Sequence, residues 1–173
     1  PVQQQARDGA QLNININGSP FHSGKLQERE EMLRTRAAEN KCAIVYVNQV
    51  GGQDELVFDG SSMVFDASGK LLARAPQFTS GLSVVEIDLD KPVVAEVAPL
   101  SDRYEEMYGA LVLGTRDYVR KNKFTDVVIG LSGGIDSSIV AAVAVEALGV
   151  EHVHGVAMPS RYSSDGSKTD AYA

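Results

Sequence analysis

The sequence predicts an α/β protein made of two parts, and three observations support this. Segments of strand-like and helix-like periodicity alternate along the 173 residues. In the second half, an apolar strand, a glycine-containing loop, an apolar helix and another strand follow one another, which predicts a parallel sheet with a right-handed crossover. A stretch bracketed by Pro92 and Pro99 separates the halves. We therefore expect one part over residues 1–90, a connector over 91–101 and a second part over 102–173.

The first part is expected to contain one helix among several strands. Residues 12–17 alternate apolar and polar side chains, which is the period of a strand with one buried face. Residues 25–40 are good helix formers whose apolar members share one stripe, and Glu30 can pair with Arg34 on the exposed side. The remaining elements are expected to be strands: a buried one at 43–47, a hairpin formed by 63–65 and 71–73, and one more at 82–87.

The second part is expected to open with a long helix. This helix should begin at Ser101 or Asp102, because glutamates follow in its first turn. Residues 127–131 are entirely apolar, as is typical of strands in parallel sheets. The rest is expected to form a loop at 132–138, a helix at 139–148 that ends at Gly149, and a strand at 153–158.

Composition narrows the classes of partner. The chain has 16 basic and 23 acidic residues, and the net charge of −7 argues against non-specific binding of nucleic acid. The sequence has no run of 18 apolar residues and no secretory signal pattern, so we expect no membrane partner. Cys42 is the single cysteine and cannot form an intramolecular disulfide, which fits a reducing compartment and predicts a cytoplasmic protein.

The segment with the clearest chemistry runs from Gly130 to Ser138 and reads Gly-Leu-Ser-Gly-Gly-Ile-Asp-Ser-Ser. A loop at the carboxyl end of a parallel strand lies where open α/β sheets bind ligands. Two adjacent glycines let the backbone approach a ligand, the next helix adds its positive end, and serine hydroxyls suit phosphate oxygens. The carboxylate of Asp136 fits such a loop if Mg²⁺ accompanies the phosphates. Alternatively, Asp136 or Ser137 only caps the helix and the glycines only form a turn, but the strand–helix frame and three hydroxyls favour the phosphate site.

The segment Ser132–Ser137 resembles the pyrophosphate-binding loop of the ATP pyrophosphatases. Within that superfamily, Gly130–Ser138 together with His154–Ser164 is most similar to NAD⁺ synthetase, and residues 108–118 resemble the entry helix of that domain. Residues 15–22 and 45–60 resemble the nitrilase-type glutaminase domain that is fused to it in glutamine-dependent NAD⁺ synthetases. The resemblance runs across nearly the whole chain, in the order of the family.

This resemblance implies a fold, a reaction and a set of ligands. The implied fold is the C-terminal part of a nitrilase-like layered α-β-β-α sandwich, followed by the start of a Rossmann-like parallel sheet of the ATP pyrophosphatase type. The implied enzyme is a ligase that uses ATP and Mg²⁺ to adenylate deamido-NAD⁺ and amidates it to NAD⁺ with ammonia from glutamine, releasing AMP and pyrophosphate. The implied assembly is a homo-oligomer.

The resemblance also assigns site residues. Asp136 is the implied metal ligand, and Ser19 and Lys25 match the positions that hold substrate glutamine. A hydroxyl beside an ammonium suits a carboxylate, whereas the simpler alternative makes Ser19 part of a turn and Lys25 a solvated lysine. The implied ATP-binding residues are Gly130, Leu131, Ser132, Gly133, Gly134, Ile135, Asp136, Ser137, Met158 and Arg161.

The glutaminase nucleophile is where the sequence departs from the family. The family's catalytic Glu, Lys and Cys lie upstream of the segment that Gly18–Phe21 resembles, and none of the 17 residues before Gly18 is Glu, Lys or Cys. Cys42 does not match the nucleophile's place and begins an apolar strand, so we expect a small buried side chain there. We therefore expect the chain to be the middle of a longer polypeptide, inactive by itself, and unstable, aggregated or oligomeric when expressed alone.

Two other functions remain open from the residues. The chain could belong to another ATP pyrophosphatase that amidates or thiolates a different acceptor, or it could be a non-catalytic fragment whose first half only packs subunits together. At individual positions, Asp59-Gly60 could be only a turn and Arg161 an ordinary surface arginine. His22, His152 and His154 lack metal-ligand spacing among themselves, so no metal site is expected of them.

Overall fold

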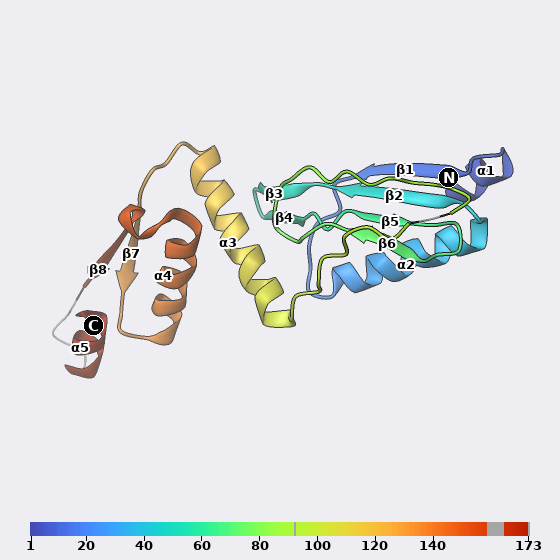
Figure 1. The fold of residues 1–173 in the computed structure, drawn as a ribbon. Coiled ribbons are helices and arrows are strands. Elements are labelled where there is room, and N and C mark those ends of the chain that lie inside the picture. The colour runs from blue at the N-terminus through green and yellow to red at the C-terminus, as the bar shows by residue number, and fades with distance from the viewer. Residues whose placement is uncertain (92, 159–164, 173) are drawn as a thin grey trace. The chain divides into compact units, whose positions relative to one another are not determined.

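The computed structural model describes residues 1–91, 93–158 and 165–172 (Figure 1). The chain divides into two compact units. The first comprises Pro1–Gly51 and Leu56–Ala110, and the second comprises Gly52–Glu55 and Leu111–Ala173. The boundary falls within a long helix, α3 (Arg103–Lys121).

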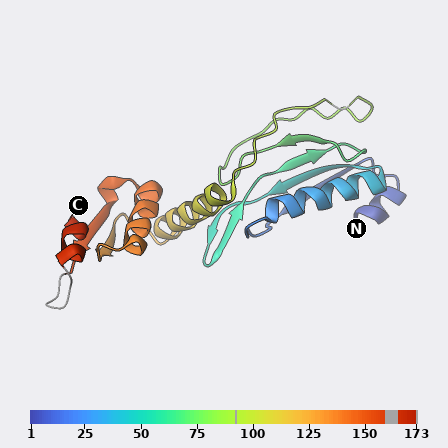
Figure 2. The ribbon, with the colours of Figure 1, turned by 90° about the horizontal axis from the view of Figure 1, so that it is seen from below.

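The first unit is built on a four-stranded sheet of order β1-β2-β5-β6. Strands β1 and β2 are parallel, and the pairs β2–β5 and β5–β6 are antiparallel, so the predicted hairpin is confirmed. Helix α2 runs along one face of this sheet (Figure 2). The bounds are α1 (Val2–Arg7), β1 (Leu12–Asn17), α2 (Lys25–Asn40), β2 (Ala43–Asn48), β5 (Met63–Phe65) and β6 (Leu71–Arg74), with a separate hairpin of β3 (Val50–Gln53) and β4 (Leu56–Asp59).

The core of the first unit lies between α2 and the sheet. The predicted stripe of α2 is confirmed, because Leu26, Leu33 and Ala37 are almost fully buried. They pack against Ile44, Tyr46, Met63 and Phe65 of the sheet and against Val2. The predicted Glu30–Arg34 pair is also present, with a distance of 2.6 Å between Oε1 and Nη2. Arg29 lies on the same buried stripe, with only 2% of its surface exposed.

The sequence predicts one buried face for β1, and the structure shows that it is the asparagine face. Ile14 and Ile16 are 63% and 84% exposed, whereas Asn13 is buried and donates a hydrogen bond to Gln5 at 2.5 Å. Alternation of apolar and polar residues fixes the strand period but does not say which face meets a helix. In this chain the asparagine side of β1 is the covered one.

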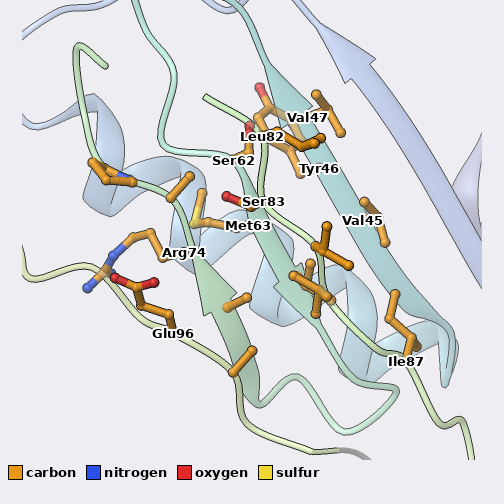
Figure 3. A pocket seen from close by; sticks show the side chains of 17 residues that line it. Val45, Tyr46, Val47, Ser62, Met63, Arg74, Leu82, Ser83, Ile87 and Glu96 are labelled. Atoms are coloured by element: carbon orange, nitrogen blue, oxygen red, sulfur yellow. The ribbon is translucent and has the colours of Figure 1, made fainter. Parts of the chain in front are cut away.

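The predicted strand at 82–87 is wrong, because this segment forms no strand. Val85 and Ile87 pack against Val64, Leu72 and Ala73, whereas Leu82 is 92% exposed. The segment lies over the sheet face opposite α2 (Figure 2). A pocket of about 400 Å³ remains between the segment and the sheet, and its lining side chains are drawn in Figure 3.

The outer edge of β6 is already taken by another segment and is not open to residues 82–87. The predicted connector occupies that edge, since Ala95 N–H donates to Leu72 O at 2.8 Å and Arg74 N–H donates to Glu96 O at 3.1 Å. The guanidinium of Arg74 then donates to Ala98 O at 2.9 and 2.8 Å and to Glu30 at 2.5 Å. Residues 95–98 are therefore fastened to the sheet rather than forming a loose connector.

The second unit contains a parallel pair of strands with the predicted crossover helix. Strands β7 (Val127–Leu131) and β8 (Val153–Ala157) pair in parallel, and α4 (Ile135–Leu148) connects them through a short 3₁₀ turn, η1 (Val150–His152). Helix α4 ends at Gly149 as predicted but begins at Ile135 rather than at residue 139. The unit ends with α5 (Asp165–Tyr172).

Helix α3 begins with a capping box around Asp102. The Asp102 carboxylate accepts the N–H groups of Tyr104 and Glu105 at 2.7 and 2.9 Å, and Glu105 accepts the N–H of Asp102 at 3.0 Å. The start at Ser101 or Asp102 is therefore close to the observed Arg103. Among the residues described, no helix combines the length and the apolar character that a membrane crossing requires.

Candidate functional site

The predicted phosphate loop lies at the carboxyl end of β7 and runs directly into α4. Gly133 has a φ of +76°, in the left-handed region that favours glycine, and Gly134 is the extended N-cap of the helix. Ser137 Oγ donates to Gly134 O at 2.9 Å and lies 3.1 Å from Ser132 Oγ. The Gly134 N–H donates to Ser132 Oγ at 3.3 Å. The serines thus fold the loop back onto the first turn of α4.

The capping alternative does not describe this loop. Within the described part of the chain, no side chain makes a cap hydrogen bond at the start of α4. The hydroxyls of Ser137 and Ser138 instead donate to the carbonyl of Gly134, at 2.9 and 3.1 Å. Among the described residues, no side chain accepts the first N–H groups of α4, and such uncapped groups are what an anion can bind at a helix N-terminus.

The other residues assigned to ATP gather at the same end of the parallel pair. Gly130 and Leu131 are the last residues of β7, and Gly130 pairs with Val156 of β8. A Cβ on Gly130 would lie 2.6 Å from Met158 Cε, so glycine makes room for Met158 there. Met158 is exposed, and Ile135 and Asp136 are exposed in the first turn of α4. Arg161 lies outside the described residues.

Ser19 and Lys25 flank a short loop in the first unit, between β1 and α2. The Ser19 N–H donates to Asn48 Oδ1 at 2.9 Å, and Lys25 is the first residue of α2. Both residues are partly buried, and Lys25 Nζ lies 3.7 Å from Glu28. The structure places these two residues in one unit and the phosphate loop in the other.

Behind this loop lies a buried ion pair that the sequence does not predict. The guanidinium of Arg29 donates to both carboxylate oxygens of Asp59, at 2.8 and 3.3 Å, and to Gly60 O at 3.2 Å. The side chains of Arg29 and Asp59 are 1% and 0% exposed. Gly60 does adopt a turn conformation, with a φ of +69°. Asp59, however, is also the buried partner of Arg29. The signal was the place of Arg29 on the apolar stripe of α2, since a buried arginine requires a carboxylate.

Cys42 is the small buried side chain that the sequence predicts. It is 0% exposed, and burial raises the pKa of its thiol. A raised pKa leaves less of the thiolate, which is the nucleophilic form. The structure therefore gives no support to Cys42 as a nucleophile.

Replacing Cys42 with serine should be nearly silent in the activity of a full-length enzyme that carries this segment. The hydroxyl can use the carbonyl of Ala43, which the thiol already approaches at 3.5 Å. We expect a loss of stability of about 1–2 kcal/mol and less than a twofold change in glutamine-dependent turnover. Steady-state kinetics with glutamine and with ammonia test this. Loss of the glutamine reaction alone would mean that Cys42 has a catalytic role.

The opposite end of β7 carries a polar cluster centred on Asp126. Hydrogen bonds from Thr125, and then from His154, lower the pKa of the Asp126 carboxyl. Its Oδ1 lies 3.1 Å from His154 Nε2 and 3.5 Å from His152 Nδ1. The two histidines thus share a carboxylate partner. Among the residues that the structure describes, no group of three or more histidine, cysteine, aspartate or glutamate side chains is placed so that it could hold a metal ion.

The family follows from the sequence and the geometry together. The family model for carbon-nitrogen hydrolases matches residues 3–93, just over half of the chain. The chain belongs to the carbon-nitrogen hydrolase family. Beyond the carbon-nitrogen hydrolase region, residues 107–173 match the family model for NAD synthase, and this match includes the whole phosphate loop.

Relatives of this carbon-nitrogen hydrolase chain combine the two regions. A glutamine-dependent NAD(+) synthetase of Aquifex aeolicus is 45% identical in an alignment of 203 residues, gaps included, that covers 98% of the chain and 36% of the relative. One from Synechocystis sp. is 44% identical and covers 100% of the chain and 32% of the relative. The structure of glutamine-dependent NAD⁺ synthetase from Acinetobacter baumannii in complex with ADP matches with a TM-score of 0.95 and 43% identity, over 99% of this chain and 33% of that one.

The chain spans about a third of the length of these curated relatives. The predicted resemblance to glutamine-dependent NAD⁺ synthetases is confirmed over nearly the whole chain. The predicted fold class is confirmed too, as a nitrilase-like region followed by a region of the NAD synthetase type.

Proposed function

We propose that the chain is a segment of a glutamine-dependent NAD⁺ synthetase. The observation that carries this proposal is that the two family matches follow one another in one chain. Relatives named glutamine-dependent NAD(+) synthetase align with 95–100% of that chain. The reaction is the ATP-dependent adenylation of the nicotinate carboxylate of deamido-NAD⁺. Ammonia then attacks the activated carbonyl carbon, AMP leaves, and the amide of NAD⁺ remains.

In this proposal the loop Ser132–Ser137 binds the pyrophosphate end of ATP. The N–H groups at the start of α4 and the hydroxyls of Ser132 and Ser137 supply hydrogen-bond donors to phosphate oxygens. Gly130, Leu131, Gly133, Gly134, Ile135, Met158 and Arg161 complete the nucleotide site as expected from the resemblance. The protein mainly positions the reactants and stabilises the charge that develops on the departing pyrophosphate.

The exposed carboxylate of Asp136 fits a magnesium ion bound together with the triphosphate. Mg²⁺ is usually held by one or two carboxylates plus substrate phosphates, so one aspartate beside this anion-binding loop is a sufficient donor set. The ion would neutralise phosphate charge there. Asp136 is thus the one residue of the loop whose negative charge has a function.

In the first unit, Ser19 and Lys25 bind substrate glutamine. A partly buried ammonium at the start of α2 and a hydroxyl on the preceding loop suit the carboxylate of that amino acid. The glutaminase Glu, Lys and Cys have no counterpart here, so this chain by itself is expected to release no ammonia. A homo-oligomer in the cytoplasm, with glutamine, ATP and deamido-NAD⁺ as its substrates, completes the proposal.

Product analysis of a full-length enzyme that carries this segment tests the proposal. With deamido-NAD⁺ and ATP, glutamine and ammonia should each yield one NAD⁺, one AMP and one pyrophosphate per turnover. If AMP and pyrophosphate form only when another carboxylate is the acceptor, or if the product is thiolated, the result would favour a different ATP pyrophosphatase. No consumption of ATP with any acceptor would favour the non-catalytic fragment.

A further inference from the structure

One buried amide holds the backbone of Ser19 at both of its polar groups. Asn48 Oδ1 accepts the Ser19 N–H at 2.9 Å, and Asn48 Nδ2 lies 3.4 Å from Ser19 O. Asn48 is the last residue of β2 and is only 6% exposed. Its own N–H donates to Ser62 Oγ at 3.0 Å. The backbone of Asn48 is therefore held on the sheet while its side chain bonds the Ser19 loop.

The amide of Asn48 is in turn fixed by the buried ion pair. Asn48 Nδ2 donates to Gly60 O at 3.1 Å and lies 3.4 Å from Asp59 Oδ1. Arg29 donates to the same carbonyl and to both oxygens of Asp59. Since the acceptors around Nδ2 are all oxygens, they also fix which end of the amide faces the Ser19 N–H.

The same ion pair holds the element that carries Lys25. Arg29 lies on α2 one turn after Lys25, so Asp59 fixes the start of α2 directly and the Ser19 loop through Asn48. Between them, Phe21 N–H donates to Val57 O at 2.7 Å, and the Phe21 ring packs edge-on against Phe78. Ser19 and Lys25 are thus anchored to one buried carboxylate from two sides.

From this arrangement we infer that Asn48 is a positioning residue for glutamine binding, backed by Arg29 and Asp59. The inference rests on the proposed role of Ser19 and Lys25. A bound carboxylate must meet a hydroxyl and an ammonium at the same time, and displacements of about 1 Å at such sites reduce rates by up to about a hundredfold. Compared with apolar side chains of similar volume, a buried ion pair adds little net stability, so we assign this one the role of fixing the distance between the two ligand-binding elements.

The test compares two buried asparagines in a full-length enzyme that carries this segment. Asn48→Ala removes the contacts to Ser19. Asn13 lies on β1, the strand next to β2, and Asn13→Ala removes its part-buried side-chain hydrogen bond to Gln5 of α1. We expect Asn48→Ala to raise the KM for glutamine about tenfold or more, while kcat and KM of the ammonia-dependent reaction stay unchanged. Asn13→Ala should leave the KM for glutamine within twofold. If Asn48→Ala yields no folded enzyme, Asn48→Ser must give the same separation.

Three results would overturn the inference. These are a KM for glutamine that stays within twofold in the Asn48 variant, an equal rise in the Asn13 variant, or an equal loss of both reactions in the Asn48 variant. Ser19→Ala and Lys25→Met separate this failure from that of the proposed site. If they raise the KM for glutamine but Asn48→Ala does not, only the positioning role is wrong. If they do not, the proposed glutamine site is wrong and the positioning role falls with it.

Discussion

Replacing Asp136 with asparagine, in a full-length enzyme that carries this segment, should abolish synthesis of NAD⁺ with either nitrogen source. Asparagine keeps the shape and the place in the first turn of α4 but removes the negative charge that suits a cation beside the phosphates. Loss of such charge stabilisation amounts to several kcal/mol, or about 10²–10³-fold or more in kcat. Hydrolysis of glutamine should remain largely intact, because Ser19 and Lys25 belong to the other unit. Measuring NAD⁺ and glutamate formation separately checks both expectations.

Asp126→Asn is the matched control for this variant. Asp126 directly precedes β7, at the end of that strand opposite to the phosphate loop. Like Asp136 it is exposed, and its carboxylate is hydrogen-bonded to Thr125 and His154. Its replacement should leave synthesis of NAD⁺ within about twofold. An Asp136→Asn enzyme that makes NAD⁺ at the normal rate with free ammonia would remove Asp136 from the nucleotide site.

Replacing Asp59 with asparagine should be among the most destabilising single changes in the first unit. It leaves the guanidinium of Arg29, which is 1% exposed, without a compensating charge. Breaking a buried pair in this way costs about 3–5 kcal/mol. Urea denaturation of the full-length enzyme, followed by circular dichroism, measures the loss.

Two further variants isolate the cause of that loss. Asp54→Asn makes the same chemical change at an exposed turn residue with a φ of +50°, which asparagine tolerates, so stability should change by less than about 0.5 kcal/mol. Adding Arg29→Met to Asp59→Asn removes the unpaired charge and should recover part of the lost stability. An Asp59→Asn enzyme as stable as the Asp54→Asn enzyme would contradict the role of the ion pair.

The second unit was predictable because its signals are local. The apolar strand β7, the glycine loop and Gly149 at the end of α4 follow one another within a short stretch of sequence. The start of α4 was missed by four residues, since a serine-rich motif reads as a loop although its last residues already form the first helical turn. The capping alternative at Ser137 could be decided only by seeing which acceptor its hydroxyl reaches.

The first unit was less predictable because its decisive contacts join distant residues. The pairing of Arg29 with Asp59 spans 30 positions, and no period in the sequence encodes it. Residues 82–87 have strand-like composition, but the edge of β6 is occupied by residues 95–98. Asn48 illustrates the same limit, since its role depends on Ser19, 29 positions away. In each case the sequence supplied the residue type, and only the fold supplied the partner.

The central claim is that ATP held at the loop Ser132–Ser137 activates the carboxylate of deamido-NAD⁺ by adenylation. Exchange of labelled pyrophosphate into ATP, catalysed by a full-length enzyme that carries this segment with neither glutamine nor ammonia present, tests it most directly. Because adenylation is reversible while pyrophosphate is bound, we expect exchange that requires deamido-NAD⁺ and disappears in the Asp136→Asn enzyme. Exchange that proceeds equally without deamido-NAD⁺, or no exchange by an enzyme that still consumes ATP, would contradict the claim.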